Sequence, residues 1–427
     1  MKEFDLPVGW KYVSLADIAN VINGVSFKPN DIKKEGIRIL RSGNIQSGYL
    51  VLKDDDVFLD NTYYNRDNTL QYLDNCITAS TGSIDVLGKC GTVFEETHNC
   101  QIGAFMRLVR SKSKDDALYI SFILHSPLYY QYIRRLSKNG TSINNINNSH
   151  LEEFKFPLPP KNVKEKISKW YYSLEKKIAL NTRMNAELEA MAKQLYDYWF
   201  VQFDFPDENG KPYKSSGGKM VYNPTLKREI PAGWDNCEIK DLSEVVNGAT
   251  PLTTNLDYYG NDIIWITPND LSNQKAKFIS CGERSLTQIG YDSCSTTLMP
   301  AGSVLMSSRA PIGLMAIAEV DLCTNQGFKN FVPYDMMDNY YLYYYVKEHM
   351  AQIEQLGAGT TFREVSRDTI IKFPILKISD RELYSKWYEQ IDSICKEQKN
   401  LLLQIRNLTH LRDSLLPMLM NGQVTVE

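Results

Sequence analysis

The sequence predicts an α+β protein made of two similar globular domains separated by two long antiparallel helices, which form a coiled coil, in a pseudo-two-fold internal repeat. Three observations indicate this class. Short motifs recur in the same order in both halves, each half ends in a long stretch with a heptad pattern, and a segment rich in Pro, Gly and Ser divides the halves. At 427 residues, the chain is long enough for each domain to bury its own core.

The repeated motifs are the strongest of these observations. A four-residue identity that contains tryptophan stands in step with a second identity, each displaced by 217 positions, from 168 to 385 and from 156 to 373. Because such agreement is improbable by chance, duplication explains it better than convergent use of common strand and helix patterns. The matched segments are 6–10 (LPVGW) with 230–234 (IPAGW), 21–24 (VING) with 245–248 (VVNG), 156–157 (FP) with 373–374 (FP), and 168–171 (SKWY) with 385–388 (SKWY).

The long stretch after each domain is predicted to be one helix. Residues 163–199 contain no proline or glycine, and apolar side chains recur there at alternating steps of four and three, as in a coiled coil. In the second stretch, Ser379 and Asp380 are expected to provide the N-cap of the helix, and Gly422 is expected to lie just past its end. The predicted boundaries are 1–160 and 230–377 for the domains, 161–203 and 378–422 for the helices, and 204–229 for the linker.

A two-fold relation between the copies would make the two helices run antiparallel between the domains. With a displacement of 217, Asn181 corresponds to Gln398, so we expect both helices to place an amide at the same level and thereby fix their register. The alternative, surface helices packed only on their own domains, fits less well because the first helix must deliver the chain to the second domain. The residues expected at the helix-helix and partner interface are Ile167, Tyr171, Leu174, Ile178, Asn181, Leu188, Leu195, Tyr388, Ile391, Gln398, Leu402 and Ile405.

The composition is that of an ordinary soluble protein. The net charge is −3, so any binding of nucleic acid must depend on local positive patches rather than on an overall positive field. No apolar stretch suits a signal peptide or a membrane span, so we expect a cytoplasmic protein without a membrane partner. The 26 tyrosines exceed what packing alone requires and suggest a contact surface.

No catalytic machinery is recognisable, and neither catalytic residues nor metal ligands are assigned. The segment from Gly82 to Cys90 has the wrong spacing for a phosphate-binding loop, and a cysteine replaces the hydroxyl that would bind magnesium. The dipeptide Asn223-Pro224 lacks the second proline and the aromatic ring of an adenine methyltransferase motif.

Three weak alternatives for a metal site remain in the sequence. Irregular spacing argues against a cysteine and histidine site, a solvated turn explains the acidic run better, and the nuclease-like set straddles the linker. These alternatives are Cys76, Cys90 and Cys100 with His98; Asp54, Asp55 and Asp56; and Pro206, Asp207, Glu238 and Lys240.

Polar turns occur in the same order in both halves. Each domain has three such turns with hydroxyl, amide or arginine side chains, and these are the groups that read base edges and phosphates. Any one of them is more often an ordinary turn residue, but the recurrence in both halves singles out the set. The residues expected to bind DNA are Arg41, Ser42, Asn44, Ser80, Thr81, Ser83, Thr141, Ser142 and Asn144 in the first domain, and Thr267, Asn269, Ser307, Ser308, Arg309, Thr360, Thr361 and Arg363 in the second.

The order of motifs in the second half resembles that of the specificity subunits of type I restriction-modification systems. The strings IIWITPNDL (263–271), PAGSVLMSSRAPIG (300–313), TNQGF (324–328) and GTTFREVSRDTIIKFPI (359–375) look like a target recognition domain that precedes the family's long helix. The first half is a more diverged version, and KPYKSSGGKMVYNPTLKREIPAGW (211–234) is similar to the family's central connection. The resemblance covers essentially the whole chain.

The resemblance implies a non-catalytic reader of double-stranded DNA. In this family each target recognition domain reads one half of a split target, the helices set the gap, and two adenine methyltransferase subunits dock on the helices. Motor-nuclease subunits join them, so S-adenosylmethionine, ATP and Mg²⁺ are implied for the partner subunits and no cofactor is expected in this chain. Two alternatives stay open: a specificity subunit of a system that only methylates, and a bivalent protein-protein adaptor with tyrosine-rich faces.

Overall fold

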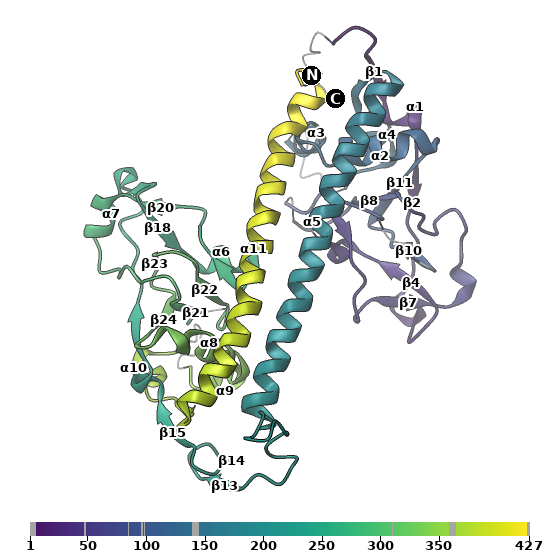
Figure 1. Ribbon diagram of the computed structural model, residues 1–427. Coiled ribbons are helices and arrows are strands. Elements are labelled where there is room, and N and C mark those ends of the chain that lie inside the picture. Colours follow the sequence, from purple (N-terminus) through teal and green to yellow (C-terminus); the bar gives the residue numbers. More distant parts are fainter. Residues whose placement is uncertain are drawn as a thin grey trace. The chain divides into compact units, whose positions relative to one another are not determined.

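The computed structural model describes residues 6–46, 48–83, 85–94, 97, 99–138, 145–309, 311–357 and 364–424. The chain forms two compact units: the first consists of Met1–Thr182 and Leu403–Glu427, and the second of Arg183–Leu402. Each unit contains one globular domain and a part of both long helices, α5 (Lys161–Tyr196) and α11 (Arg381–Met420) (Figure 1). No helix in the described part of the chain is both long and apolar enough to span a membrane.

The domain of the first unit has two sheets and one strand pair. The larger sheet has the strand order β2 (Ala19–Asn23), β11 (Met106–Ser111), β8 (Asn75–Thr78), β9 (Cys90–Thr92), β6 (Tyr49–Leu50) and β5 (Ile45–Gln46). The smaller sheet has the order β10 (Cys100–Ile102), β4 (Ile37–Leu40), β7 (Val57–Leu59) and β3 (Ile32–Lys33), and β1 (Lys11–Ser14) pairs with β12 (Lys155–Leu158). The helices are α1 (Leu15–Ile18), α2 (Lys114–Leu124), α3 (Pro127–Lys138) and α4 (Asn148–Glu152).

The domain of the second unit is built in the same way. Its larger sheet has the order β16 (Ser243–Asn247), β24 (Phe328–Pro333), β21 (Val304–Ser307), β22 (Met315–Ala318) and β19 (Phe278–Ile279). The smaller has the order β17 (Tyr259–Gly260), β20 (Ser285–Leu286), β18 (Ile263–Ile266) and β23 (Cys323–Thr324), and β15 (Asp235–Glu238) pairs with β25 (Pro374–Lys377). Before it, β13 (Met220–Asn223) and β14 (Arg228–Pro231) form a hairpin; the helices are α6 (Pro268–Gln274), α7 (Gln288–Asp292), α8 (Asn339–Glu348), α9 (Met350–Gln355) and α10 (Arg367–Ile370).

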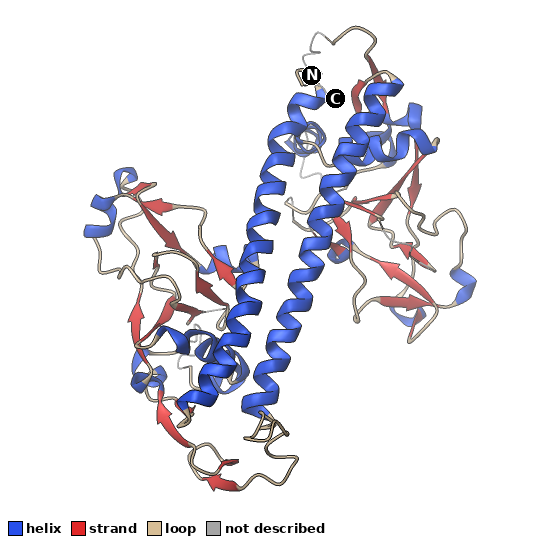
Figure 2. Ribbon diagram, viewed as in Figure 1, coloured by secondary structure: helices blue, strands red, loops and turns tan. Residues whose placement is uncertain are grey.

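The strand orders of the two domains correspond, except that the edge strand β5 has no counterpart among the described strands of the second domain. In the larger sheets β2, β11, β8, β9 and β6 correspond to β16, β24, β21, β22 and β19, and the fully buried strands β8 and β21 occupy the same place. Figure 2 shows that both domains combine strands with helices. In the smaller sheets β10 pairs with β4 in parallel, as β23 does with β18. The predicted fold class, a duplicated α+β domain combined with long helices, is therefore confirmed.

The long helices pair antiparallel within each unit, as predicted. In each unit, the contact that lies further along α5 has its partner at an earlier residue of α11. The contacts are Glu175 with Arg412 and Asn181 with Gln404 in the first unit, and Glu189 with Gln398 and Phe200 with Trp387 in the second.

The ends of α11 follow the predicted capping signals. Asp380 precedes the helix and its side chain accepts a hydrogen bond of 2.9 Å from the backbone amide of Leu383. Gly422 lies two residues past the last helical residue with a φ of 70°, a left-handed conformation that glycine adopts without a steric penalty. At the end of α5 the chain continues as a π-helical turn, η4 (Asp197–Val201).

The repeat of the two helices is displaced by 220 positions and not by 217. Helix α5 begins at residue 161 and α11 at residue 381. The order of buried, half-buried and exposed side chains along residues 161–200 recurs along residues 381–420 at all but a few positions. Because equivalent helices bury the same face, this burial pattern decides the register.

The predicted correspondence of Asn181 with Gln398 is therefore wrong. With a displacement of 220, Asn181 corresponds to Leu401 and Gln398 to Ile178. Both amides are buried, but they lie at different levels of the repeat. The identical SKWY segments are out of register as well, since the tryptophan of the first is half-buried and that of the second is buried.

In the first unit a buried ion pair links the domain to the helices. Glu175 of α5 and Arg412 of α11 lie 2.9 Å apart, and their side chains are 4% and 21% exposed. The hydroxyl of Tyr49 in β6 donates to the Glu175 carboxylate. Burial and the charge of Glu175 raise the pKa of Tyr49, so the hydroxyl keeps the proton that it donates. Because a buried charge needs partners, this network fixes β6 on the helices.

The second unit uses unrelated residues at the corresponding place. Lys277, directly before β19, is 5% exposed, and its ammonium lies 3.3 Å from the carboxylate of Glu189 in α5 and 3.2 Å from the amide oxygen of Gln398 in α11. The hydroxyl of Tyr344 in α8 lies 2.6 Å from the same ammonium. Thus β19 and β6 occupy the same place in their sheets, but different chemistry connects each to its helices.

The tyrosine-rich helix α8 belongs to the core of the second unit. Its five tyrosines are 1–3% exposed and pack with residues of α5 and α11. The suggestion that the tyrosine excess marks a contact surface is wrong for this segment, because these rings are used in packing. The five are Tyr340, Tyr341, Tyr343, Tyr344 and Tyr345.

We predict that Arg412→Met lowers the free energy of unfolding of the first unit by about 3 kcal/mol, because it leaves the Glu175 carboxylate buried without its cation. A second substitution, Glu175→Gln, should recover part of this loss. Denaturation in urea measures both. The control is Lys193→Met, which removes a cation whose side chain is 65% exposed and should change stability by no more than about 0.5 kcal/mol. Equal effects of Arg412→Met and the control would contradict the prediction.

Candidate nucleic-acid interface

In the second domain a short turn, residues 325–327, connects two of the predicted polar turns. The backbone amide of Asn325 donates to the carbonyl of the last residue of β18, directly before Thr267, at 3.1 Å. The carbonyl of Gly327 accepts from the backbone amide of Ser308 at 2.7 Å. The turn after β18 and the turn after β21 are therefore neighbours.

The side chains of these turns divide into buried and exposed groups. Ser307 and Ser308 are fully buried, and their hydroxyls donate to backbone carbonyls of the same domain at 2.7 and 3.3 Å. The hydroxyl of Thr267 donates to the carboxylate of Asp270 at 2.6 Å. By contrast, Asn269 and Arg309 are exposed. The two serines and Thr267 therefore hold the turns in shape.

Arg309 is paired with the carboxylate of Glu364, which directly follows the third predicted turn in the chain. Its Nε lies 3.0 Å from Glu364, and Lys329 contacts the same carboxylate at 3.1 Å. Although burial acts in the opposite direction, the hydrogen bonds from Lys329 and Arg309 lower the pKa of Glu364, which therefore stays charged. The two cations and the one carboxylate together leave one positive charge at this place.

The first domain repeats the arrangement. The backbone amide of Gly103 donates to the carbonyl of Leu40, directly before Arg41, at 2.9 Å. The carbonyl of Phe105 accepts from the backbone amide of Ser80 at 3.0 Å. The turn of residues 103–105 thus connects the turn after β4 with the turn after β8.

The predicted residues of the first domain also differ in exposure. Arg41 and Ser83 are exposed, whereas Ser42, Ser80 and Thr81 are half-buried. Asn44 is 2% exposed, and its amide donates to the carboxylate of Asp56 at 2.6 Å and to a backbone carbonyl at 3.0 Å. Asn44 is therefore a scaffold residue of its turn.

The third predicted turn of each domain lies outside the described residues. Directly after these turns in the chain, Asn145 forms a bridge with Ser80, and Glu364 forms one with Arg309. The chain that leaves each third turn therefore contacts the second turn. The residues outside the described part are Thr141, Ser142, Asn144, Thr360, Thr361 and Arg363.

The connecting turns are not among the predicted site residues, although each contains an exposed side chain. Phe105 is 71% exposed in the first domain, and Gln326 is exposed in the second. The string TNQGF contains Gln326 and carries a signal for its turn, but a lone phenylalanine next to β11 has the pattern of a core residue.

No group of three or more His, Cys, Asp or Glu that could hold a metal ion occurs within the described ranges. Asp207 accepts hydrogen bonds inside its own linker turn, and Glu238 pairs with Lys240. The three cysteines of the sequence alternative, Cys76, Cys90 and Cys100, are buried, and His98 lies outside the described residues.

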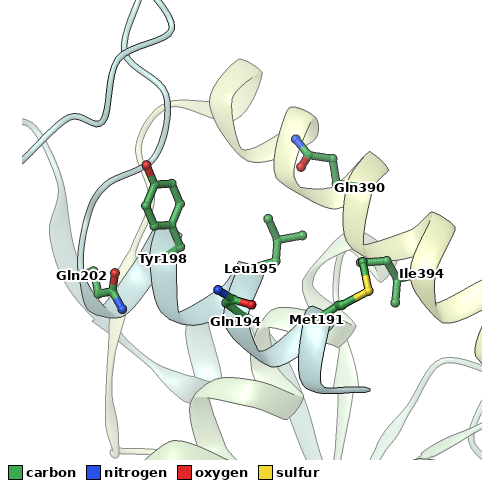
Figure 3. Close-up of a pocket in the computed structure, with 7 residues that line it drawn as sticks. All are labelled: Met191, Gln194, Leu195, Tyr198, Gln202, Gln390 and Ile394. Atoms are coloured by element: carbon green, nitrogen blue, oxygen red, sulfur yellow. The ribbon is translucent and has the colours of Figure 1, made fainter. Parts of the chain in front are cut away.

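The helices of the second unit carry an apolar groove of about 390 Å³. Figure 3 shows the side chains that line it: Met191, Gln194, Leu195, Tyr198, Gln202, Gln390 and Ile394. With a displacement of 220, the counterparts in the first unit are mostly apolar too: Leu411, Ser414, Leu415, Met418, Gly422, Trp170 and Leu174. The counterparts Met191 and Leu411 are 55% and 44% exposed, whereas none of the twelve predicted interface residues is exposed.

A family model described as type I restriction modification DNA specificity domain matches residues 7–190 and 231–377. The chain belongs to this family. One relative is the MjaIX specificity subunit of Methanocaldococcus jannaschii. The chain is 38% identical to it over 175 residues, and the match covers 40% of each chain. The chain is 25% identical over 356 residues to the HindI specificity subunit of Haemophilus influenzae, covering 72% of this chain and 77% of that one.

A solved structure agrees with the fold of this family member. The crystal structure of the type I restriction-modification S subunit from M. genitalium has a TM-score of 0.59, 12% identity and coverage of 98% of both chains. The predicted membership among type I specificity subunits is thus confirmed. Because the relatives are named specificity subunits, the prediction of a subunit without a catalytic role of its own is confirmed as well.

We predict that Asn44→Ala lowers the free energy of unfolding by about 2 kcal/mol, because it removes a buried donor from the Asp56 carboxylate. Scanning calorimetry of the full chain measures the change. Arg41→Ala in the same turn is the matched control, and its effect should stay within about 0.5 kcal/mol because Arg41 is exposed. A stable Asn44→Ala variant would show that this side chain is not a scaffold residue.

Proposed function

We propose that this chain is the DNA-reading subunit of a type I restriction-modification complex, with each domain reading one half of a split double-stranded target. The observation that carries the proposal is the duplicated cluster of turns. The same backbone arrangement occurs in both domains, but the exposed side chains differ: the connecting turn exposes Phe105 in the first domain and Gln326, one position earlier in its turn, in the second. A shared scaffold with different exposed groups suits two half-sites of different sequence.

Among the predicted DNA-binding residues, the exposed ones suit direct contact. Arginine suits guanine or phosphate, and asparagine suits adenine, so Arg41, Arg309 and Asn269 have matching chemistry and access. The buried Asn44, Ser307 and Ser308 support the turns instead. The six residues of the third turns stay in the proposed set, with Ser42, Ser80, Thr81 and Ser83, whereas Thr267 supports its own turn through Asp270.

The helices are proposed to dock two adenine methyltransferase subunits and to set the gap between the half-sites. Two equivalent apolar surfaces, the groove around Met191 and the positions around Leu411, suit two copies of one partner. Motor-nuclease subunits would complete the complex in the cytoplasm. S-adenosylmethionine, ATP and Mg²⁺ would then act in the partner subunits, and this chain would need no cofactor.

Two rival proposals are a protein-protein adaptor and a specificity subunit of a system that only methylates. A protein-protein adaptor with tyrosine-rich faces has less support, because the five tyrosines of α8 are buried in the core of the second unit. A system that only methylates would have the same specificity subunit, and an assay for cleavage of unmethylated DNA separates it from a restricting one.

We predict that co-expression of this chain with its neighbouring methyltransferase gives adenine methylation at a split motif. Exchange of residues 230–377 for the same domain of another family member should change one half of the motif and leave the other half unchanged, because each domain has its own cluster of turns. Methylome sequencing measures both results. Changes in both halves, or a continuous motif, would contradict the proposal.

We predict that Met191→Asp and Leu411→Asp each reduce the bound methyltransferase from two copies to one, and that the double variant binds none. A buried charge in an apolar contact should weaken docking at least about tenfold. Native mass spectrometry counts the copies. Leu252→Asp changes another exposed apolar residue, 65% exposed, and should still bind two. Two copies on the double variant would rule out these surfaces.

A further inference from the structure

Phe105 is an apolar, solvent-exposed residue in the turn that connects two polar turns of the first domain. It is 71% exposed, whereas Met106 directly after it and Gly103 two positions before it are buried. A single exposed apolar residue is common on protein surfaces and needs no function by itself. The way in which this turn is fixed, and its place in the domain, set Phe105 apart.

The backbone on both sides of Phe105 is fixed by hydrogen bonds. Its carbonyl accepts from the backbone amides of Ala79 and Ser80 at 2.9 and 3.0 Å. The guanidinium of Arg107 donates to the carbonyls of Ala104 and Met106, at 3.0 and 2.8 Å.

Arg107 is itself held in place. Its Nε donates to the side-chain oxygen of Asn148 in α4 at 2.8 Å. Phe105 is therefore displayed on a rigid turn, and a rigid aromatic group loses little conformational entropy when it binds.

The position of this turn joins Phe105 to the proposed DNA-reading groups. One end of the turn bonds to the residue before Arg41, and the other end to Ser80. Hydroxyl and arginine side chains read the hydrogen-bonding edges of bases, but they match poorly with apolar base surface such as the thymine methyl group. Phenylalanine has no donor or acceptor and suits that apolar surface.

In the second domain the position that corresponds to Phe105 is the buried Gly327, whose carbonyl accepts from Ser308 as that of Phe105 accepts from Ser80. The exposed residue of this turn is Gln326, one position earlier, and it pairs with the hydroxyl of Thr250. At the position that corresponds to Arg107 stands Lys329, which pairs with Glu364 instead of holding the turn. The fixed apolar tip is thus a feature of the first domain.

We propose that Phe105 is a specificity-determining residue of the first domain, which contacts the apolar surface of one base in the half-site read by that domain. This inference rests on the proposed function, because it names a contact within the same interface. It adds an apolar element to a site otherwise described by polar side chains.

The test is methylome sequencing of the complex of the full chain with its methyltransferase, for wild type and four variants. Phe105→Ala and Phe105→Gln should relax the preference for one base pair in one half-site by about five- to tenfold, with the other half-site unchanged. Phe105→Leu keeps an apolar group and should retain most of the preference. Val8→Ala, at another exposed apolar residue of the same unit, should leave the motif unchanged.

The outcomes separate this inference from the proposed function. If the wild-type complex methylates no split motif, the proposed function fails. If the wild type gives a split motif and the alanine and glutamine variants keep every base preference, the role of Phe105 is refuted. A fall in methylation that is equal at all sites with an unchanged motif would also refute it, because the side chain would then affect assembly and not the choice of base.

Discussion

The structure depends on burying charge where each domain meets the helices. A carboxylate or an ammonium group removed from water must find partners, and few arrangements of the surrounding backbone provide them. Glu175 and Arg412 meet this demand in the first unit, and Lys277 with Glu189 in the second. Tyr49 stands in β6 and Lys277 directly before β19, and these strands hold the same place in their sheets, so unlike residues connect equivalent strands to the helices. The turns proposed to read DNA project from sheets that are fixed in this way.

Much of the fold follows from patterns that act locally. Heptad spacing, the absence of helix breakers, the Asp380 cap and the terminal Gly422 each depend on a few neighbouring residues, and the structure agrees with all of them. The predicted register of the repeat in the two long helices is wrong. The SKWY identity suggested a displacement of 217, but a helix is placed by the face that it buries, and burial depends on distant residues such as the α8 tyrosines.

The candidate site was predictable as a set of turns but not residue by residue. Polar residues after strands indicate turns reliably, yet whether a side chain such as Asn44 points to solvent or to Asp56 depends on a residue twelve positions away. Ser307 and Ser308 illustrate the same difficulty, since small hydroxyls satisfy backbone carbonyls as readily as they contact a ligand. Phe105 shows the reverse case: its type indicates a core, and only the hydrogen bonds around it reveal that the turn holds it outside.

The division of the chain within α5 and α11 has a consequence for biosynthesis. The core of the first unit includes Leu416, Leu419 and Met420 beside Ile167 and Tyr171, so it joins segments made early with segments made late. At about 5–20 residues per second, the ribosome needs on the order of tens of seconds to add the intervening chain. During that time the first domain exposes apolar surface that α11 will later cover. Stalled translation in the second half would therefore release a product with an open core, which chaperones and proteases recognise.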